Sequence, residues 1–166
     1  EGWGHVNLAD TLYPPAGRTS ILYDTFSLVT GESNIFAFTS AGSNKLCVTL
    51  AWTDYPATAG SGVKLVNDLD LTVQTPDGAI LYPNYPGTTP DRLNNIEGID
   101  IGFTDAGTYT IVIRGFNVPY GPQPYALVLR EDASVTAPRL ELPQTNITIL
   151  AAAGETNSTA LVISNT

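Results

Sequence analysis

Two aspartates stand two residues apart in the segment LVNDLDLTVQTPDG, residues 65–78. Polar and apolar residues alternate from Asp68 to Val73, which is the period of a half-buried β-strand. Asp68 and Asp70 therefore share one face of the predicted strand. Because aspartate is a poor strand former, this pair is the first place to look for chemistry.

One chemistry that fits the pair is calcium binding. Calcium takes about 6–8 oxygen ligands at roughly 2.3–2.6 Å, and residues i and i+2 of a strand lie about 6.5–7 Å apart. Asp68 and Asp70 could therefore reach one ion, whereas without a cation they repel and one pKa should rise. Further oxygen donors are nearby in the sequence: Asp54, Asn67, Asp91, Asn94, Asn95 and Glu97.

The alternative is an arrangement without an ion. Asp68 and Asp70 would then lie on the solvated face of an antiparallel strand, with hydrogen bonds to loop amides such as those of residues 55–62. The Asn94-Asn95 pair would likewise be turn residues that bond to nearby backbone. The spacing of the two aspartates, taken alone, favours this alternative.

Nucleophilic catalysis requires a hydroxyl or thiol beside a base that an acid orients. The chain has one histidine, His5, and one cysteine, Cys47, which lies within the apolar run LCVTLAW. A GxSxG elbow, HExxH, a P-loop and a dinucleotide fingerprint are all absent from the sequence. We therefore expect these residues to be non-catalytic and Cys47 to be a small core residue.

Composition narrows the class of partner. The 166 residues have a formal net charge of −9, with 7 Lys and Arg against 16 Asp and Glu. This balance argues against nucleic acid and against an anionic membrane surface. No apolar run approaches the roughly 20 residues of a membrane-spanning helix, so we expect no membrane insertion.

Eight short runs with strand patterns lie between about Ile21 and Leu129, separated by turn-forming segments. The runs are residues 21–29, 34–40, 45–53, 69–75, 79–82, 96–103, 108–115 and 124–130. Asp77-Gly78 is a hairpin signal between two of them. Strands this short and this close predict an all-β fold, an antiparallel jelly-roll β-sandwich of about eight strands.

The two ends of the chain differ from this middle part. Residues 6–12 could form a short N-terminal helix that ends before two prolines. Strand alternation resumes in NITIL and ALVIS, residues 146–150 and 160–164. The expected domains are a terminal helical segment at residues 1–14, the sandwich at residues 15–132, and a linker with the start of a further β-domain at residues 133–166.

Taken in order, the motifs resemble those of subtilisin-like serine proteases. GWGHVNLADTL, residues 2–12, resembles the last helix of their catalytic domains. KLCVTLAWTDYP, LVNDLDLTVQTPDG, DRLNNIEGI and GTYTIVIRGFNVPYGPQPYALVL then resemble the C-terminal jelly-roll domain of the alkaline, oxidation-resistant secreted subtilisins and related archaeal enzymes. The resemblance covers about residues 2–129.

This resemblance implies a secreted or cell-surface endopeptidase whose Asp-His-Ser triad lies upstream. It implies a jelly roll that packs beside the catalytic domain and often carries calcium. The WTD and NDLD matches carry over to Asp54, Asn67, Asp68 and Asp70, as ligands of calcium or as a site that pins loops. His5 occupies a variable place in GWGxVN and is not the catalytic histidine. Residues 133–166 loosely resemble the start of an Ig-like domain.

Two functions follow as hypotheses. The first is a non-catalytic accessory domain that stabilises the subtilisin-like catalytic domain of the same chain and influences access of a polymeric substrate. The alternative is a carbohydrate- or matrix-binding module, or simply a spacer in a surface array. Loop aromatics could serve such binding: Tyr82, Tyr85, Phe116 and Tyr120. Core packing is expected instead for Trp52, Tyr55, Tyr109 and Tyr125.

Overall fold

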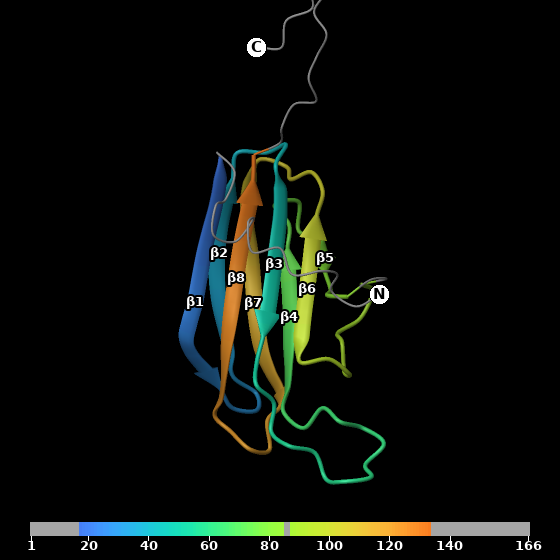
Figure 1. Ribbon diagram of the computed structural model, residues 1–166. Helices are drawn as coiled ribbons and strands as arrows, with labels where there is room; N and C mark the ends of the chain where they lie inside the picture. Colours follow the sequence, from blue (N-terminus) through green and yellow to red (C-terminus); the bar gives the residue numbers. More distant parts are fainter. Residues whose placement is uncertain (1–16, 85–86, 134–166) are drawn as a thin grey trace, which may run out of the picture. The chain divides into compact units, whose positions relative to one another are not determined.

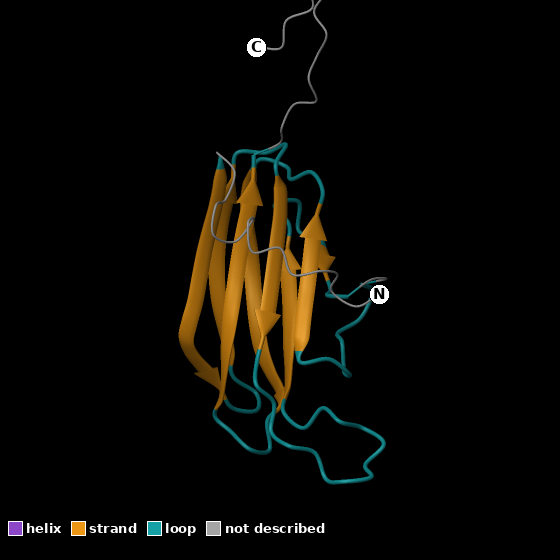
Figure 2. Ribbon diagram, viewed as in Figure 1, coloured by secondary structure: helices purple, strands orange, loops and turns teal. Residues whose placement is uncertain are grey.

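Eight β-strands make up the part of the chain that the computed structural model describes, residues 17–84 and 87–133 (Figures 1 and 2). These residues contain no helix, which confirms the all-β prediction. The strands are β1 (Arg18–Leu28), β2 (Ser33–Ser40), β3 (Lys45–Ala51), β4 (Asp68–Gln74), β5 (Ile80–Leu81), β6 (Ile96–Ile101), β7 (Gly107–Asn117) and β8 (Gln123–Asp132). None of the described residues belongs to a helix long and apolar enough to cross a membrane.

The chain divides into two compact units, residues 1–134 and residues 135–166, and every described residue belongs to the first. The helix predicted at residues 6–12 lies outside the described residues. The strands predicted at residues 146–150 and 160–164 lie outside them too.

The two sheets interleave in the order of a jelly roll. One has the order β1-β8-β3-β6 and the other β2-β7-β4-β5. The strands pair antiparallel as β1 with β8, β2 with β7, β3 with β6 and β4 with β5. These nested pairs wrap into two facing sheets (Figure 1), which confirms the predicted jelly-roll sandwich.

The core lies between the sheets and follows the alternation seen in the sequence. On β4, Leu69, Leu71 and Val73 point inward and are fully buried. Residues of the other strands, and Trp52 just after β3, complete this core: Leu28, Phe38, Leu46, Val48, Leu50, Trp52, Ile99, Tyr109, Ile111, Ile113, Tyr125, Leu127 and Leu129. Because burial of apolar surface is the main favourable term in folding, this layer holds the two sheets together.

Strand β4 has a partner strand along only one edge for most of its length. It pairs with β7 from Asp68 to Gln74, but with β5 only at Val73 and Gln74. On the unpaired stretch, the amide of Leu71 donates a hydrogen bond to the side chain of Glu97 on β6 instead. Glu97 on β6 and Arg92 in the segment before β6 thus contact β4 along this edge, and Arg92 does so at the predicted site residues Asp68 and Asp70.

Candidate functional site

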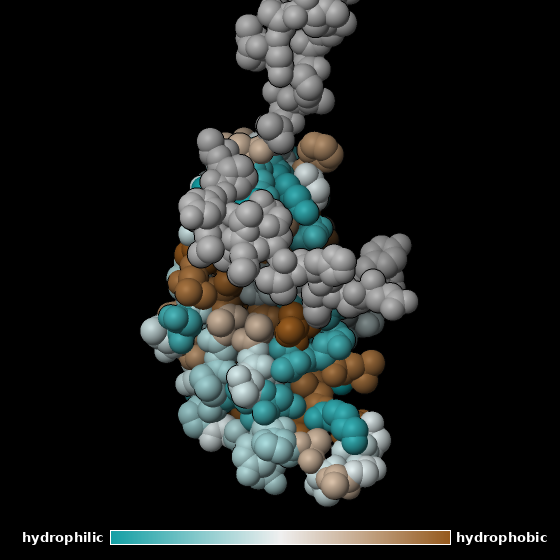
Figure 3. Space-filling model, in the orientation of Figure 1, coloured by the Kyte–Doolittle hydropathy of each residue, from teal (hydrophilic) through white to brown (hydrophobic). Residues whose placement is uncertain are grey.

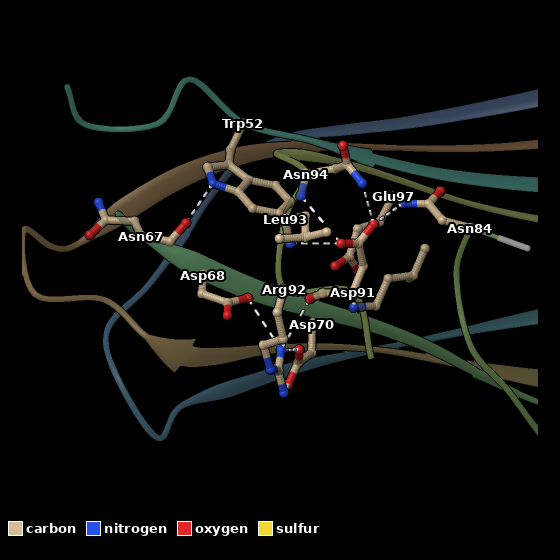
Figure 4. Close-up of polar contacts among 11 residues, drawn as sticks. Trp52, Asn67, Asp68, Asp70, Asn84, Asp91, Arg92, Leu93, Asn94 and Glu97 are labelled. Atoms are coloured by element: carbon tan, nitrogen blue, oxygen red, sulfur yellow. Dashed lines mark hydrogen bonds and ion pairs between the residues drawn. The ribbon is translucent and has the colours of Figure 1, made fainter. Parts of the chain in front are cut away.

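Asp68 and Asp70 lie side by side on β4 and share one cation, the guanidinium of Arg92 (Figure 4). Arg92 Nη1 donates to Asp68 Oδ1 at 3.2 Å and also to Asp70 Oδ1. Arg92 Nη2 donates to Asp70 Oδ2 at 3.2 Å, so Asp70 is held through both of its oxygens. The guanidinium carbon lies 3.6 Å from the ring centroid of Phe116, in cation–π contact.

This arrangement differs from the solvated, loop-bonded pair that the spacing of the two aspartates favours. The two aspartates are not on a solvated face, since each is only 7% exposed. Their hydrogen bonds go to a side chain, not to the loop amides of residues 55–62. Burial raises the pKa of Asp68 to about 6; Arg92 opposes the rise and Asp70 adds to it. The predicted rise of one pKa is therefore present, although desolvation is its main cause.

Asp91 fixes the turn that presents Arg92. Its Oδ1 accepts from the amides of Leu93, at 2.7 Å, and Asn94, at 3.2 Å. Its Oδ2 accepts from the side-chain amides of Asn84 and Asn94. Burial raises the pKa of Asp91, but these hydrogen bonds outweigh it and hold the pKa below its usual value. The residue before Arg92 is thus an ionised, hydrogen-bonded anchor.

Glu97 is a fully buried carboxyl between the two sheets. Its Oε2 accepts from the amide of Leu71 at 2.6 Å, whereas Oε1 has no hydrogen-bond partner among the described residues. Burial raises the pKa of Glu97 from 4.5 to about 9; the Leu71 amide opposes this, and the nearby carboxylates, led by Asp70, add to it. Glu97 is therefore protonated at neutral pH.

Asp54 belongs to a different set of contacts. Its Oδ1 accepts from the amides of Tyr55 and Asn67, both at 2.7 Å, and its Oδ2 accepts from the amide of Val66 at 2.8 Å. Asp54 therefore closes the base of the long loop between β3 and β4. Asp54 thus has the loop-pinning role that the sequence suggested for it together with Asn67, Asp68 and Asp70, whereas Asp68 and Asp70 bind Arg92.

Asn67 connects the same loop to the turn before β8. Its Nδ2 donates to Tyr120 O at 2.8 Å and to Gln123 Oε1 at 2.7 Å, and its Oδ1 accepts from the Tyr120 amide at 3.1 Å. Its backbone carbonyl accepts from Trp52 Nε1 at 2.9 Å. The side-chain amide of Asn67 therefore joins two loops at one end of the sandwich through hydrogen bonds.

Tyr55 and Tyr120 stack where these loops meet. The ring centroids are 4.1 Å apart and the rings are tilted by only 6°. Tyr55 is 48% exposed and Tyr120 57%, so the prediction that Tyr55 packs in the core is wrong. The predictions for Trp52, Tyr109 and Tyr125 are confirmed by their burial, while Tyr85 lies outside the described residues.

The four predicted metal residues thus fall into two groups. Asp68 and Asp70 face Arg92 (Figure 4). Asp54 bonds to loop backbone amides, and Asn67 bonds to loop backbone and to Gln123. In residues 17–84 and 87–133, no three His, Cys, Asp or Glu side chains are grouped as ligands of one metal ion. The donors therefore do not fit a single calcium site with Arg92 in place, and calcium binding stays a prediction.

Arg92, Glu97 and Gln123 complete the site. The sequence pattern predicts Glu97 only as an oxygen donor, and it predicts no role for Arg92 or Gln123. One signal was available for Arg92: it is a basic residue inside DRLNNIE, in a chain with only 7 Lys and Arg. For Gln123 no signal existed, because its partners come from loops far away in the sequence.

The one cysteine offers little to nucleophilic chemistry. Cys47 is buried on β3, and its Sγ accepts from Arg130 Nη2 at 3.4 Å. Burial raises its pKa, with Asp100 adding to the rise, so it is a thiol at neutral pH. Cys47 is buried, as expected for a small core residue, but Leu46 and Val48 beside it belong to the core, so Cys47 lies on the opposite face of β3.

Comparison with known proteins links the chain to serine proteases. It is 30% identical over 167 residues to the serine protease/ABC transporter B family protein tagB of Dictyostelium discoideum, which covers 77% of this chain. It is 29% identical to tagD over 77% of the chain, and 27% identical to tagA over 82%. The chain spans about 9% of the length of each of these relatives.

Two further comparisons add little. No family model matches the chain. Among solved structures, the P-domain of Penaeus vannamei nodavirus covers 67% of this chain, and the chain covers 94% of it, at 15% identity and a TM-score of 0.30. A likeness that weak carries no argument about fold or function.

Proposed function

We propose that the chain is a non-catalytic accessory domain of a secreted or cell-surface, subtilisin-like serine endopeptidase, which stabilises the catalytic domain of the same protein. The observation that supports this most is the identity of about 30% over 77% of the chain to proteins named as serine proteases, of which it matches only a small part. A domain of that size inside a protease can be something other than its catalytic domain.

The chemistry of the described residues agrees with a supporting role. Asp68, Asp70 and Arg92 fasten the segment before β6 to β4, and Asp54 and Asn67 fasten the loops at one end. These are contacts that hold a domain in shape. Residues 17–84 and 87–133 include no histidine that could serve as the base of a triad.

The test has two arms. The 166-residue chain, treated with a fluorophosphonate probe and a general peptide substrate, should show neither labelling nor hydrolysis. The protein encoded by the complete gene should contain an Asp-His-Ser triad before residue 1, and removal of residues 17–133 from it should lower the melting temperature of the protease. Labelling of the chain itself, or a gene without a triad, would contradict the proposal.

The stacked pair Tyr55 and Tyr120 supports a second candidate function, the binding of carbohydrate. Exposed aromatic rings from two pinned loops are a surface on which sugar rings can stack. Glycan-array binding by the wild type that is lost in Tyr55→Ala and Tyr120→Ala, but kept in Ile35→Ala, would favour this function. Ile35 is a matched control because it is also exposed and lies on β2.

A further inference from the structure

Strand β2 is an edge strand with one unpaired side. It pairs with β7 along its whole length, from Ser33 to Ser40, in an unbroken register. No described strand pairs with its other side. The backbone N–H and C=O groups on that side are therefore a template for one more strand.

The other edge strands of the described sheets each have a feature that hinders such pairing. Strand β1 has a break in register between Tyr23 and Phe26, with the charged residue Asp24 inside the break. Strand β5 has only two residues, and β6 has an exposed aspartate, Asp100. Strand β2, SNIFAFTS, is eight residues long and has no charge, no proline and no break in register. It therefore lacks the features by which edge strands usually avoid other chains.

Aromatic rings are partly open to solvent on the same side of the sandwich, where β1 and β2 both lie (Figure 1). The ring centroids of Tyr23 and Phe26 on β1 are 4.4 and 5.3 Å from that of Phe36 on β2. Phe26 is 38% exposed, and Tyr23 and Phe36 are only partly buried. Apolar residues also reach the surface over the middle of β1 (Figure 3). On the outer face of β2, Ile35 is 68% exposed, so a strand added to this edge covers apolar surface on both of its faces.

We propose that the partner of this edge is β2 of a second copy of the chain, so that two four-stranded sheets join edge to edge about a two-fold axis. A two-fold interface brings a surface against itself, so the surface must be self-complementary. The chain has a net charge of −9, which makes two copies repel each other over much of their surface. Strand β2 meets the requirement because it has no charged residue to repel its own copy.

The alternation of β2 favours one register for this antiparallel pair. When Ala37 lies opposite Ala37 of the second copy, Phe36 lies opposite Phe38. Asn34 then lies opposite Ser40, so that aromatic residues meet aromatic residues and polar residues meet polar residues. Cross-strand pairs of these kinds stabilise a sheet. The two-fold axis passes at Ala37, where any charged side chain would face its own copy.

This inference goes beyond the proposed function and does not depend on it. The pairing uses the described strand β2 alone, and it is tested on the 166-residue chain. A gene without a protease triad would defeat the proposed function and leave the pairing of β2 unaffected.

Sedimentation velocity of the 166-residue chain at increasing concentration tests the pairing. We expect a dimer that salt strengthens, because salt screens the repulsion between two acidic copies. Ala37→Lys places two ammonium groups opposite each other across the axis and should leave only monomer at the same concentrations. Thr110→Lys is the matched control, because Thr110 is the partner of Ala37 on β7 and lies away from the free edge. This control should still dimerise.

A charge exchange makes the outcome specific to the register. Ala37→Glu alone should also be monomeric, whereas a mixture of Ala37→Lys with Ala37→Glu should restore a dimer, because opposite charges then face each other. Ala37 is exposed, and urea unfolding shows that each variant is folded.

Three outcomes overturn the proposal. The first is a wild type that stays monomeric at every concentration, even if it captures an extended peptide, because the partner would then be another chain. The second is a dimer that persists in both single variants, which places the contact on another surface. The third is a mixture of the two folded variants that remains monomeric.

Discussion

Arg92 is the residue on which the candidate site depends, because it neutralises two buried carboxylates at once. Removal of one partner from such a cluster leaves uncompensated charge in a poorly solvated place. Its guanidinium also binds Asp70 through two nitrogens and lies on Phe116. A lysine supplies the charge but neither of these two planar contacts.

We therefore expect Arg92→Ala to lower the free energy of unfolding by about 2 kcal/mol. This is less than the loss for a fully buried pair, because 36% of the Arg92 side chain is exposed and water screens the charges. Arg92→Lys should recover part of the loss. Urea unfolding measures both, with Arg114→Ala as the control on the neighbouring strand β7. An equal loss in Arg114→Ala would contradict a specific role for Arg92.

Glu97 gives the fold a dependence on pH. Its pKa is about 9 in the folded state and near 4.5 when unfolded, so the unfolded chain releases a proton that the folded chain keeps. The contribution of Glu97 to stability is complete below about pH 4.5 and is lost as pH rises toward 9. At pH 7 the loss amounts to about 3 kcal/mol.

Glu97→Gln should remove this dependence, since an amide does not ionise and its oxygen still accepts from the Leu71 amide. The stability of the variant relative to the wild type should increase steadily from about pH 5 to about pH 8. Urea unfolding across that range measures the difference. Parallel stability curves for the two proteins would show that Glu97 is not protonated in the fold.

At the scale of elements, the loop between β3 and β4 depends on one carboxylate. Asp54 accepts three backbone amides at its base, and their loss leaves donors without partners. We expect Asp54→Ala to lower the free energy of unfolding by about 2 kcal/mol and to open the loop to trypsin at Lys64. Limited proteolysis with mass spectrometry locates the cut.

The control for this prediction is Asp105→Ala. Asp105 is an exposed loop aspartate for which the described residues provide no side-chain hydrogen bond. Its removal should change neither stability nor the rate of cleavage. Equal cleavage at Lys64 in both variants and the wild type would mean that Asp54 does not hold the loop.

The strands were predictable and the site was predictable only in part, for a physical reason. Alternation and turn chemistry are local, so β4 could be recognised from DLDLTV together with the Asp77-Gly78 turn. Arg92, the partner of Asp70, is 22 residues away in the sequence. The contact between them forms only because the turn at Asp91 directs the side chain of Arg92 toward β4. Local sequence patterns do not predict the direction of a side chain in such a turn.

The grouping of Asp54 and Asn67 with Asp68 and Asp70 shows the same limit. Asn67 and Asp68 are adjacent in sequence, but Asn67 ends the loop and Asp68 begins β4, and adjacent residues in extended backbone point to opposite sides. Asn67 and Asp68 therefore serve different surroundings, one at the loops and one at Arg92. Alternation could have separated Asn67 from Asp68, although it could not have named their partners.

At the scale of the whole molecule, the site already contains a cation of its own. Because Arg92 occupies the position between Asp68 and Asp70, excess EDTA should leave the melting temperature of the wild type unchanged. Differential scanning calorimetry with calcium and with EDTA measures this, with Asp68→Ala and Asp70→Ala as companions. A calcium-dependent rise that both variants lose would instead establish a calcium site there.

The first and last strands of the sandwich are neighbours, and this has a mechanical consequence. Arg18 opens β1 opposite Asp132 at the end of β8, and the two are joined by an ion pair of 2.5 Å. Among the described strands, β1 pairs only with β8. A pull on the chain from both sides would therefore load this ion pair first and then peel β1 from β8 one hydrogen bond at a time. Under tension such a domain would unfold sequentially, beginning at the end of the sheet where Arg18 and Asp132 lie.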